Sequence, residues 1–407
     1  LSSTSINAVG GTGLFGPAEI NSGIFTGGNG GQIVADTANT VAVAGDGGPA
    51  VYLTSSDSTI LNGIFTGGNG GNITLSNGTA LADGGSGLIS IKTLDGEADG
   101  VSDTTTLTIN NGIFTGGNGG RATSGNGLTQ ALAGTGAQLY GGTNIISGGT
   151  FSGGNKGSSS SELNLDIALG VRNAHYLSIT NANGNKPLIS GDMTLDDIDN
   201  VNLQSGRVTG KIIIGGSINN FDVSSDLEVD GNFEIGYIHT SSLTSNASVN
   251  VNIDSNNDGS VFKNINMFNE SVLTFSNQTF KSATDANISI NEQSEIVFLN
   301  GATLSPGTTI NIGLGTLNSD ASIVLNNSSS INLNYNGTDN GELNISSGSL
   351  DLSASNTKLH LTGSPSNSNG TVNFGILGDN SDTIDQSKIT TDFGWLLNTS
   401  VSTEGNS

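Results

Sequence analysis

The chain of 407 residues holds 62 Gly and no Cys, and 35 acidic against 11 basic residues give it a net charge of −24. This charge argues against binding to nucleic acids or anionic membranes. The missing Cys excludes disulfides and Cys-ligated zinc, and no apolar run reaches the roughly 18 residues that a membrane span needs. Scarce helix formers and abundant Val, Ile, Thr, Asn and Gly favour short strands joined by tight turns. The apolar 33% falls in alternating runs, which a disordered chain lacks.

The first 157 residues contain an internal repeat. Residues 21–31 read NSGIFTGGNGG, 61–71 read LNGIFTGGNGG, 110–120 read NNGIFTGGNGG, and a diverged copy, SGGTFSGGNKG, occupies 147–157. Repeats at such spacing are typical of solenoids, propellers or arrays.

Each copy begins with a triplet that reads as a short strand with its central Phe directed into the core. The following GGNGG is expected to use positive φ and close backbone approach to make a sharp corner. The Phe positions lie 40, 49 and 37 residues apart, and we expect two coils of about 20 residues in each interval. The predicted structural-repeat residues are Phe25, Phe65, Phe114 and Phe151.

From residue 158 onward the Gly-rich motif disappears and strand-like alternation becomes more regular. Near the end of the chain, successive apolar runs begin 22, 21, 19 and 22 residues apart, as expected for one coil of a β-helix. These runs begin at Ile288, Ile310, Ile331, Leu350 and Val372. A second phase through Ile323, Leu343 and Leu359 predicts at least two sheets facing each other across one core.

The sequence therefore predicts an all-β fold, a right-handed parallel β-helix (β-solenoid) forming a single elongated rod. A propeller is the main rival, but its blades of about 40–45 residues should recur along the whole chain, and the late period is half of that. The expected divisions are a Gly-rich solenoid at 1–157, a regular solenoid with coils of about 20 residues at 158–390, and a C-terminal cap or tail at 391–407.

Four segments carry a resemblance to a known family. GATLSPGTTINIG (301–313), ASIVLNNSSSINLN (321–334), GELNISSGSLDLSAS (341–355) and SGGTFSGGN (147–155) resemble passenger domains of bacterial autotransporters. The resemblance covers roughly half of the chain, and it is one of composition and rhythm. It implies a right-handed parallel β-helix displayed outside the Gram-negative envelope, although the chain lacks the family's C-terminal β-barrel.

One segment matches a metal-binding pattern. Residues 254–259 read DSNNDG, in which alternating oxygen ligands surround a turn-forming Gly and suit Ca²⁺. Asp254, Asn256 and Asp258 are the candidate ligands of a weak calcium site. Ile265 stands where the EF-hand loop has its bidentate Glu, and an Asx-rich turn is the alternative interpretation. Calcium is the only cofactor that the sequence suggests.

The run Leu195–Asp199 places three carboxylates close together, as paired aspartates are placed in sugar-cleaving β-helices. Such enzymes also need a His motif and basic residues for the uronate, whereas His175, His239 and His360 lie in unrelated sequence contexts and the three arginines lie in separate segments. We therefore interpret the run as a solvated turn and expect no catalytic residues.

Two smaller features complete the sequence analysis. Gly11, Gly13 and Gly16 match the letters of a dinucleotide fingerprint, but no strand–helix context surrounds them. The segment 392–400, with the single Trp395, is a candidate cap or interface at the end of the solenoid.

Three functions remain open. The first is a non-enzymatic extracellular adhesin or structural protein on, or released from, a bacterial cell surface, with surface glycans, proteins or other copies of itself as partners. The second is a self-assembling filament or matrix subunit built by stacking of solenoid ends. The third is a polysaccharide-active enzyme. Outward Thr and Asn ladders on flat sheets could bind ice, glycans or another copy. The sequence favours the first function, without membrane insertion of this segment.

Overall fold

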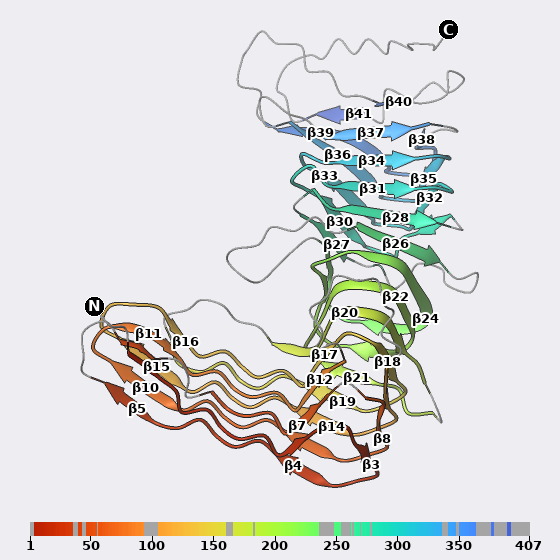
Figure 1. Cartoon of the computed structure of the whole chain (residues 1–407). Helices are drawn as coiled ribbons and strands as arrows, with labels where there is room; N and C mark the ends of the chain where they lie inside the picture. Colours follow the sequence, from red (N-terminus) through yellow and green to blue (C-terminus); the bar gives the residue numbers. More distant parts are fainter. Residues whose placement is uncertain are drawn as a thin grey trace, which may run out of the picture. The chain divides into compact units, whose positions relative to one another are not determined.

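The computed structural model describes residues 4–35, 40–42, 46–54, 56–92, 105–159, 166–181, 184–235, 248–253, 262, 264–268, 270–276, 279–335, 341–346, 350–363, 376–377 and 389–391 (Figure 1). These residues form β-strands and connecting segments, with no helix among them. They fall into two compact units, residues 1–213 with 226–231, and residues 214–225 with 232–407. The Gly-rich segments end near residue 158, inside the first unit.

In the first unit, successive coils (complete circuits of the chain) lie in register. The first three coils each contain five strands: β2 (Leu14–Phe15), β3 (Glu19–Ile20), β4 (Ile24–Thr26), β5 (Ile33–Ala35) and β6 (Thr40–Ala42); β7 (Val51–Leu53), β8 (Ser58–Ile60), β9 (Ile64–Thr66), β10 (Asn72–Leu75) and β11 (Gly78–Leu81); β12 (Leu88–Ile91), β13 (Thr106–Ile109), β14 (Ile113–Thr115), β15 (Arg121–Ser124) and β16 (Thr129–Gln130). β1 (Thr4–Ile6) pairs with β6 before them.

Each strand pairs in parallel with its counterpart in the next coil. A fourth coil begins with β17 (Ala137–Tyr140), β18 (Thr143–Ile146) and β19 (Thr150–Ser152), and the chain after β19 still pairs with β15 at Ser158. Narrower coils follow, with β20 (Ile167–Ile179), β21 (Leu188–Ser190) and β22 (Asp192–Val208). Two further strands, β23 (Ile212–Ile214) and β24 (Ile218–Val229), contain the positions at which the units divide. The unit is thus all-β and parallel, as a β-solenoid requires.

The repeated Phe residues form one internal stack. Phe25, Phe65, Phe114 and Phe151 are direct register partners, and their ring centroids lie 5.4, 4.7 and 4.8 Å apart in sequence order. The last three are fully buried, whereas Phe25, in the first of these coils, is half-buried. The inward direction of the Phe residues is confirmed.

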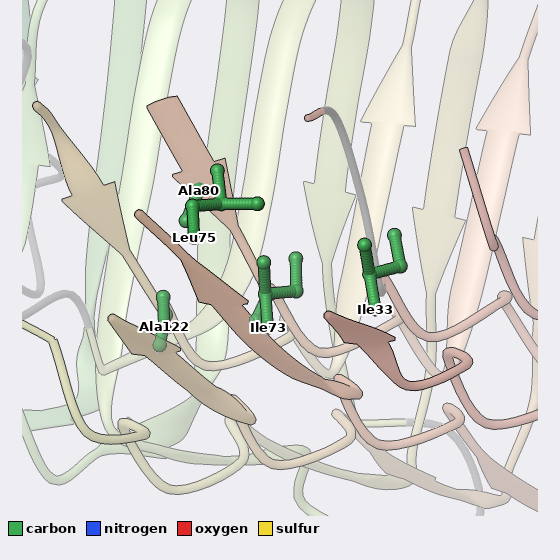
Figure 2. Packing of buried hydrophobic residues seen from close by; sticks show 7 residues of the cluster. Ile33, Ile73, Leu75, Ala80 and Ala122 are labelled. Atoms are coloured by element: carbon green, nitrogen blue, oxygen red, sulfur yellow. The ribbon is translucent and has the colours of Figure 1, made fainter. Parts of the chain in front are cut away.

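The predicted number of coils between the Phe residues is wrong. Because Phe25 and Phe65 are partners on adjacent strands, the 40 residues between them make one wide coil and not two narrow ones. The additional length reaches a second, smaller core, formed between β5, β10 and β15 on one side and β6, β11 and β16 on the other. Figure 2 shows this core, which contains Ile33, Ile73, Leu75, Ala80, Ala82, Ala122 and Ala131.

The GGNGG segments connect the two cores and are not corners. No residue of 27–31, 67–71 or 116–120 has a positive φ. In the second coil the N–H groups of Gly67 and Gly70 donate to the equivalent segment of the next coil, at 2.9 and 2.8 Å, while Gly68 donates to Gly48 of the returning chain at 2.8 Å. Gly67 and Gly70, three residues apart, thus donate to the same neighbour. This repeat is expected for an extended, polyproline II-type chain, which has three residues per turn.

In this layer the outgoing segments bond both to one another and to the returning segments. Gly85, in the returning segment between β11 and β12, donates to the carbonyl oxygen of Gly68 at 2.8 Å. A Cβ placed on Gly68 would lie 1.9 Å from the carbonyl oxygen of Gly28. The predicted close backbone approach is therefore confirmed, and it is the reason for Gly here. The parallel wavy segments between β4 and β5 and their counterparts follow this layer (Figure 1).

The second unit has shorter coils, and from β27 onward its strands stack in three rows. Its strands are β25 (Phe233–Ile235), β26 (Ser248–Ile253), β27 (Asn264–Met267), β28 (Val272–Ser276), β29 (Phe280–Lys281), β30 (Asn287–Ile290), β31 (Glu295–Phe298), β32 (Ala302–Leu304), β33 (Thr309–Ile312), β34 (Thr316–Ser319), β35 (Ile323–Leu325), β36 (Ser330–Tyr335), β37 (Glu342–Ile345), β38 (Leu350–Asp351), β39 (Lys358–Gly363), β40 (Ile376–Leu377) and β41 (Ile389–Thr391). From β27 to β37 each strand pairs in parallel with the third strand after it, for example β30 with β33 and β33 with β36.

The predicted register is right at first and wrong later. Ile288, Ile310 and Ile331 are partners, as expected, but the next partner is Leu359, 28 positions further on. Leu350 instead pairs with Ile323 on another sheet. The predicted second phase through Ile323, Leu343 and Leu359 is wrong, because these residues lie on β35, β37 and β39, which belong to three separate rows of paired strands. Val372 lies outside the described residues.

Buried side chains fill the core of the second unit. Five Phe residues touch one another through their rings, and a row of buried hydroxyl groups lines one corner. Within that row Ser282 and Thr308 lie 2.7 Å apart and the hydroxyl of Ser329 donates to the carbonyl oxygen of Ser305 at 2.8 Å. The buried hydroxyl groups of this row are thus satisfied by an adjacent coil. The Phe residues are Phe233, Phe262, Phe275, Phe280 and Phe298.

Candidate interaction surface

The outward side of the repeated triplet carries a row of exposed Ile. Strand alternation directs Phe inward, and its neighbours Ile and Thr therefore point outward. Ile24, Ile64 and Ile113 are register partners on β4, β9 and β14, and 77, 42 and 48% of their surfaces are exposed. Thr150 takes the same place on β19. Folding of the core does not require Ile at these positions.

The same side continues across the glycine layer. Residues three apart lie on one side of a polyproline II-type chain, and Thr26, Asn29 and Gln32 are all exposed. The Asn residues at the centres of the GGNGG segments form a ladder. The side-chain oxygen of Asn29 accepts the backbone N–H of Asn69 at 2.8 Å, and Asn118 and Asn155 repeat the contact at 2.9 and 2.8 Å.

Beyond the glycine layer lie the outward residues of β5, β10 and β15. One row contains Val34, Thr74 and Thr123, in which the Thr123 hydroxyl donates to that of Thr74 at 3.3 Å. We call the whole surface the Ile–Thr–Asn face. It comprises Ile24, Thr26, Asn29, Gln32, Val34, Ile64, Thr66, Asn69, Asn72, Thr74, Ile113, Thr115, Asn118, Arg121 and Thr123, with Thr150, Ser152 and Asn155 in the fourth coil.

A second surface feature lies on β20 and β22. Arg172 forms an ion pair with Asp196 at 2.7 Å, and Nδ1 of His175 lies 3.0 Å from Asp199. Asn173 and Asp197 separate these pairs at corresponding positions of the two coils, with φ of 50° and 51°. The carboxylate run is therefore a strand with a left-handed corner at Asp197, a conformation in which Asp and Asn are enriched.

The structure thus brings together His175, Arg172 and the carboxylate run, which the sequence analysis had separated. His175 and Asp199 lie 24 positions apart, which is one coil at this point in the chain, so the coil length was the signal that could have paired them. Both contacts join adjacent coils, and three of their four side chains are about half exposed. A glycosidase instead directs two carboxyl groups at one sugar bond, one of them as a general acid.

The second unit presents rows of amide side chains. Asn332 donates from its side-chain amide to the oxygen of Asn311 at 2.7 Å, and Asn344 donates to Asn318 at 2.9 Å on the neighbouring sheet. In the next coil His360 occupies the register position of Asn332, and its Nδ1 lies 2.6 Å from the Thr390 hydroxyl. These ladders satisfy side chains between coils and leave a repeated polar surface.

Two carboxyl groups of the first unit have raised pKa values. Burial raises the pKa of Asp46, a rise that a backbone hydrogen bond from Asp83 opposes and the charge of Asp83 increases. Burial and the charge of Asp192 likewise raise the pKa of Asp166. Asp46 lies on a returning Gly-rich segment, where its Oδ1 accepts the N–H of Asp83 at 2.9 Å.

The remaining predicted sites cannot be located. Asp254, Asn256 and Asp258, the calcium candidates, and Trp395, the cap candidate, lie outside the described residues. Within the described part of the chain, no group of three or more His, Asp or Glu side chains is placed to hold a metal ion. That part also contains no helix long and apolar enough to cross a membrane.

No protein-family model, curated protein or solved structure matches the chain. The likeness to autotransporter passengers therefore rests on composition, rhythm and a parallel β-fold.

Proposed function

We propose that this chain is a non-enzymatic structural or adhesive β-solenoid, displayed on or released from a bacterial cell surface. The supporting observation is that its outward residues repeat the same chemistry from coil to coil. The Ile row on β4, β9 and β14 and the Asn ladders of both units extend over several coils. A surface of this kind suits an extended partner better than a single small substrate.

The proposed helix is right-handed, because parallel strands joined by a crossover in one sheet are right-handed in about 98% of cases. The extracellular location accords with the absence of Cys, the scarcity of Lys and the net charge of −24, which keeps such a surface soluble.

Binding of the fluorescently labelled chain to intact bacterial or host cells tests this function. We expect saturable binding without any change in the polysaccharides of the surface. Release of reducing ends or unsaturated sugars from neutral or acidic polysaccharides would refute a non-enzymatic role, and the absence of binding to every cell type tested would refute an adhesive one.

A polysaccharide-active enzyme is the second candidate, and the contacts between His175 and Asp199 and between Arg172 and Asp196 are the observations that favour it. If these residues act on sugars, Asp199→Asn should abolish product release while Asp230→Asn should not. Asp230 is a matched control because it forms a similar exposed ion pair with Arg207 at 2.7 Å.

A further inference from the structure

The Ile–Thr–Asn face has a composition that folding does not explain. The inward Phe of each triplet and the Gly before the triplet, where an added Cβ would lie 2.6–3.0 Å from the Phe ring, have clear roles in the core. The outward Ile has none, yet it recurs at Ile24, Ile64 and Ile113, although the connecting segments have diverged in length. Repeated exposed Ile in otherwise polar surroundings indicates a contact surface.

The face is also exceptional in its charge. The chain has a net charge of −24, but the face contains no acidic residue and a single basic one, Arg121. Acidic residues lie on other surfaces of the same unit, among them Glu19, Asp57 and Asp199. Two copies repel each other in most orientations, and the repulsion is smallest when these uncharged faces meet.

The size of the face fits a weak, specific contact. It runs from residue 24 to residue 34, or about 30 Å at 3.1–3.3 Å per residue, and spans four coils at about 4.8 Å each. The area is therefore on the order of 500 Å² per copy, and the total buried by two copies is close to the ~1,000 Å² at which specific interfaces begin.

We propose that the Ile–Thr–Asn face joins two copies of this chain face to face. The contact is isologous, so that each copy contributes the same rows. Exposed Ile side chains lose contact with water, and rows of Thr hydroxyl and Asn amide groups meet across the interface. The ladder bonds engage the side-chain oxygens of Asn29, Asn69 and Asn118, and the NH₂ groups take no part in them. This contact is lateral, unlike end-to-end stacking of coils, and does not depend on the proposed adhesive role.

Sedimentation velocity over a concentration series tests the contact in the full chain. We expect a monomer–dimer equilibrium in the micromolar to millimolar range that strengthens with added NaCl, because salt screens the repulsion between acidic copies. An interface made of ion pairs would weaken instead.

The decisive variant is Ile64→Glu with Ile113→Glu. Four carboxylates would then enter each dimer interface, and we expect the dimer to dissociate about tenfold more readily or not to form at all. The control, Thr59→Glu with Thr108→Glu, adds the same charge on the outward side of β8 and β13, beside the face. Equal melting temperatures of the two double variants establish that both fold.

Several results would overturn the proposal: a wild-type chain that stays monomeric at the highest concentration, a dimer that both variants weaken equally, or a series of larger species that neither variant affects. Retention of a monomeric wild-type chain in a neutral polysaccharide gel, lost in the Ile variant, would assign the face to a glycan instead. Cell binding and sugar release are measured separately, so failure of the dimer is distinguishable from failure of the proposed function.

Discussion

Replacing Gly68 with Ala tests the close packing of the glycine-rich layer. The new Cβ would lie 1.9 Å from the carbonyl oxygen of Gly28 and 2.5 Å from its carbon, whereas ordinary contacts begin near 3.4 Å. Both neighbours are backbone, so no side chain can rotate away. The coils must separate by more than 1 Å at this point, which strains the hydrogen bonds of Gly68 with Gly48 and Gly85, both 2.8 Å long.

The expected loss of stability follows from these contacts. Overpacking a close-packed interior costs about 1–3 kcal/mol, and two weakened hydrogen bonds add about 1 kcal/mol each. The smaller conformational freedom of Ala in the unfolded chain returns about 0.4–1 kcal/mol. We therefore expect Gly68→Ala to destabilise the first unit by about 2–5 kcal/mol. Gly11→Ala is the control, since a Cβ there meets nothing within 4 Å, and it should be neutral or slightly stabilising.

Urea unfolding followed by far-ultraviolet circular dichroism gives the free-energy difference, and hydrogen exchange detected by mass spectrometry shows where protection is lost. Exchange should rise in peptides that contain Gly28, Gly48 and Gly85. If the two alanine variants agree within about 0.5 kcal/mol, the layer is not packed as described and the reasoning fails.

Four further predictions rest on side-chain packing, hydrogen bonding and charge. Phe114→Ala should lower the free energy of unfolding in urea by about 3–5 kcal/mol, because the Phe114 ring is stacked on both sides. The control Phe15→Ala should cost far less, since Phe15 is mostly exposed. Similar losses of stability in the two variants would contradict the internal stack. Thr308→Val should cost about 1–3 kcal/mol, since it deletes a buried hydroxyl that two neighbours use, and an unchanged urea midpoint would argue against the corner row. Burial raises the pKa of Asp46, so the folded protein holds the Asp46 proton more tightly than the unfolded chain does, and the ionised carboxylate destabilises the fold. Asp46→Asn should therefore stabilise the protein at neutral pH. This gain should vanish as the pH falls through the folded-state pKa towards the unfolded value. Hydrogen bonds from Ser353 lower the pKa of Asp351, so Asp351→Asn should destabilise the protein at neutral pH and lose this effect in acid. Melting temperatures of both Asp variants are measured from pH 3 to 7. If both variants change the stability at neutral pH in the same direction, the assignment of the two pKa shifts is wrong.

Within the repeat, alternation was enough to predict which residues point inward. Period-two geometry places Phe65 and Phe114 on one side of their triplets and Ile on the other, whatever the partner strand is. The regular spacing of the alternating runs, 22 and 21 residues, aligned Ile288, Ile310 and Ile331. It failed after Ile331, because the connection before Leu359 is longer and alternation contains no information about loop length.

The candidate surface was only partly predictable. The notion of outward Thr and Asn ladders followed from composition and alternation, but the rows themselves required the register between coils. The contacts of His175 with Asp199 and of Arg172 with Asp196 span a whole coil, so neighbouring residues gave no indication of them.

The amino-acid sequence by itself determined an all-β chain of repeated parallel strands, with Phe inside and Gly wherever backbones approach closely, because these preferences are local. Only the tertiary structure decided how far the chain travels before it returns. An extended Gly-rich segment lengthens a coil without adding a strand, so one 40-residue interval holds a single wide coil with two cores. Its hydrogen bonds go to other coils and to the returning chain, and those partners exist only once the coils are stacked.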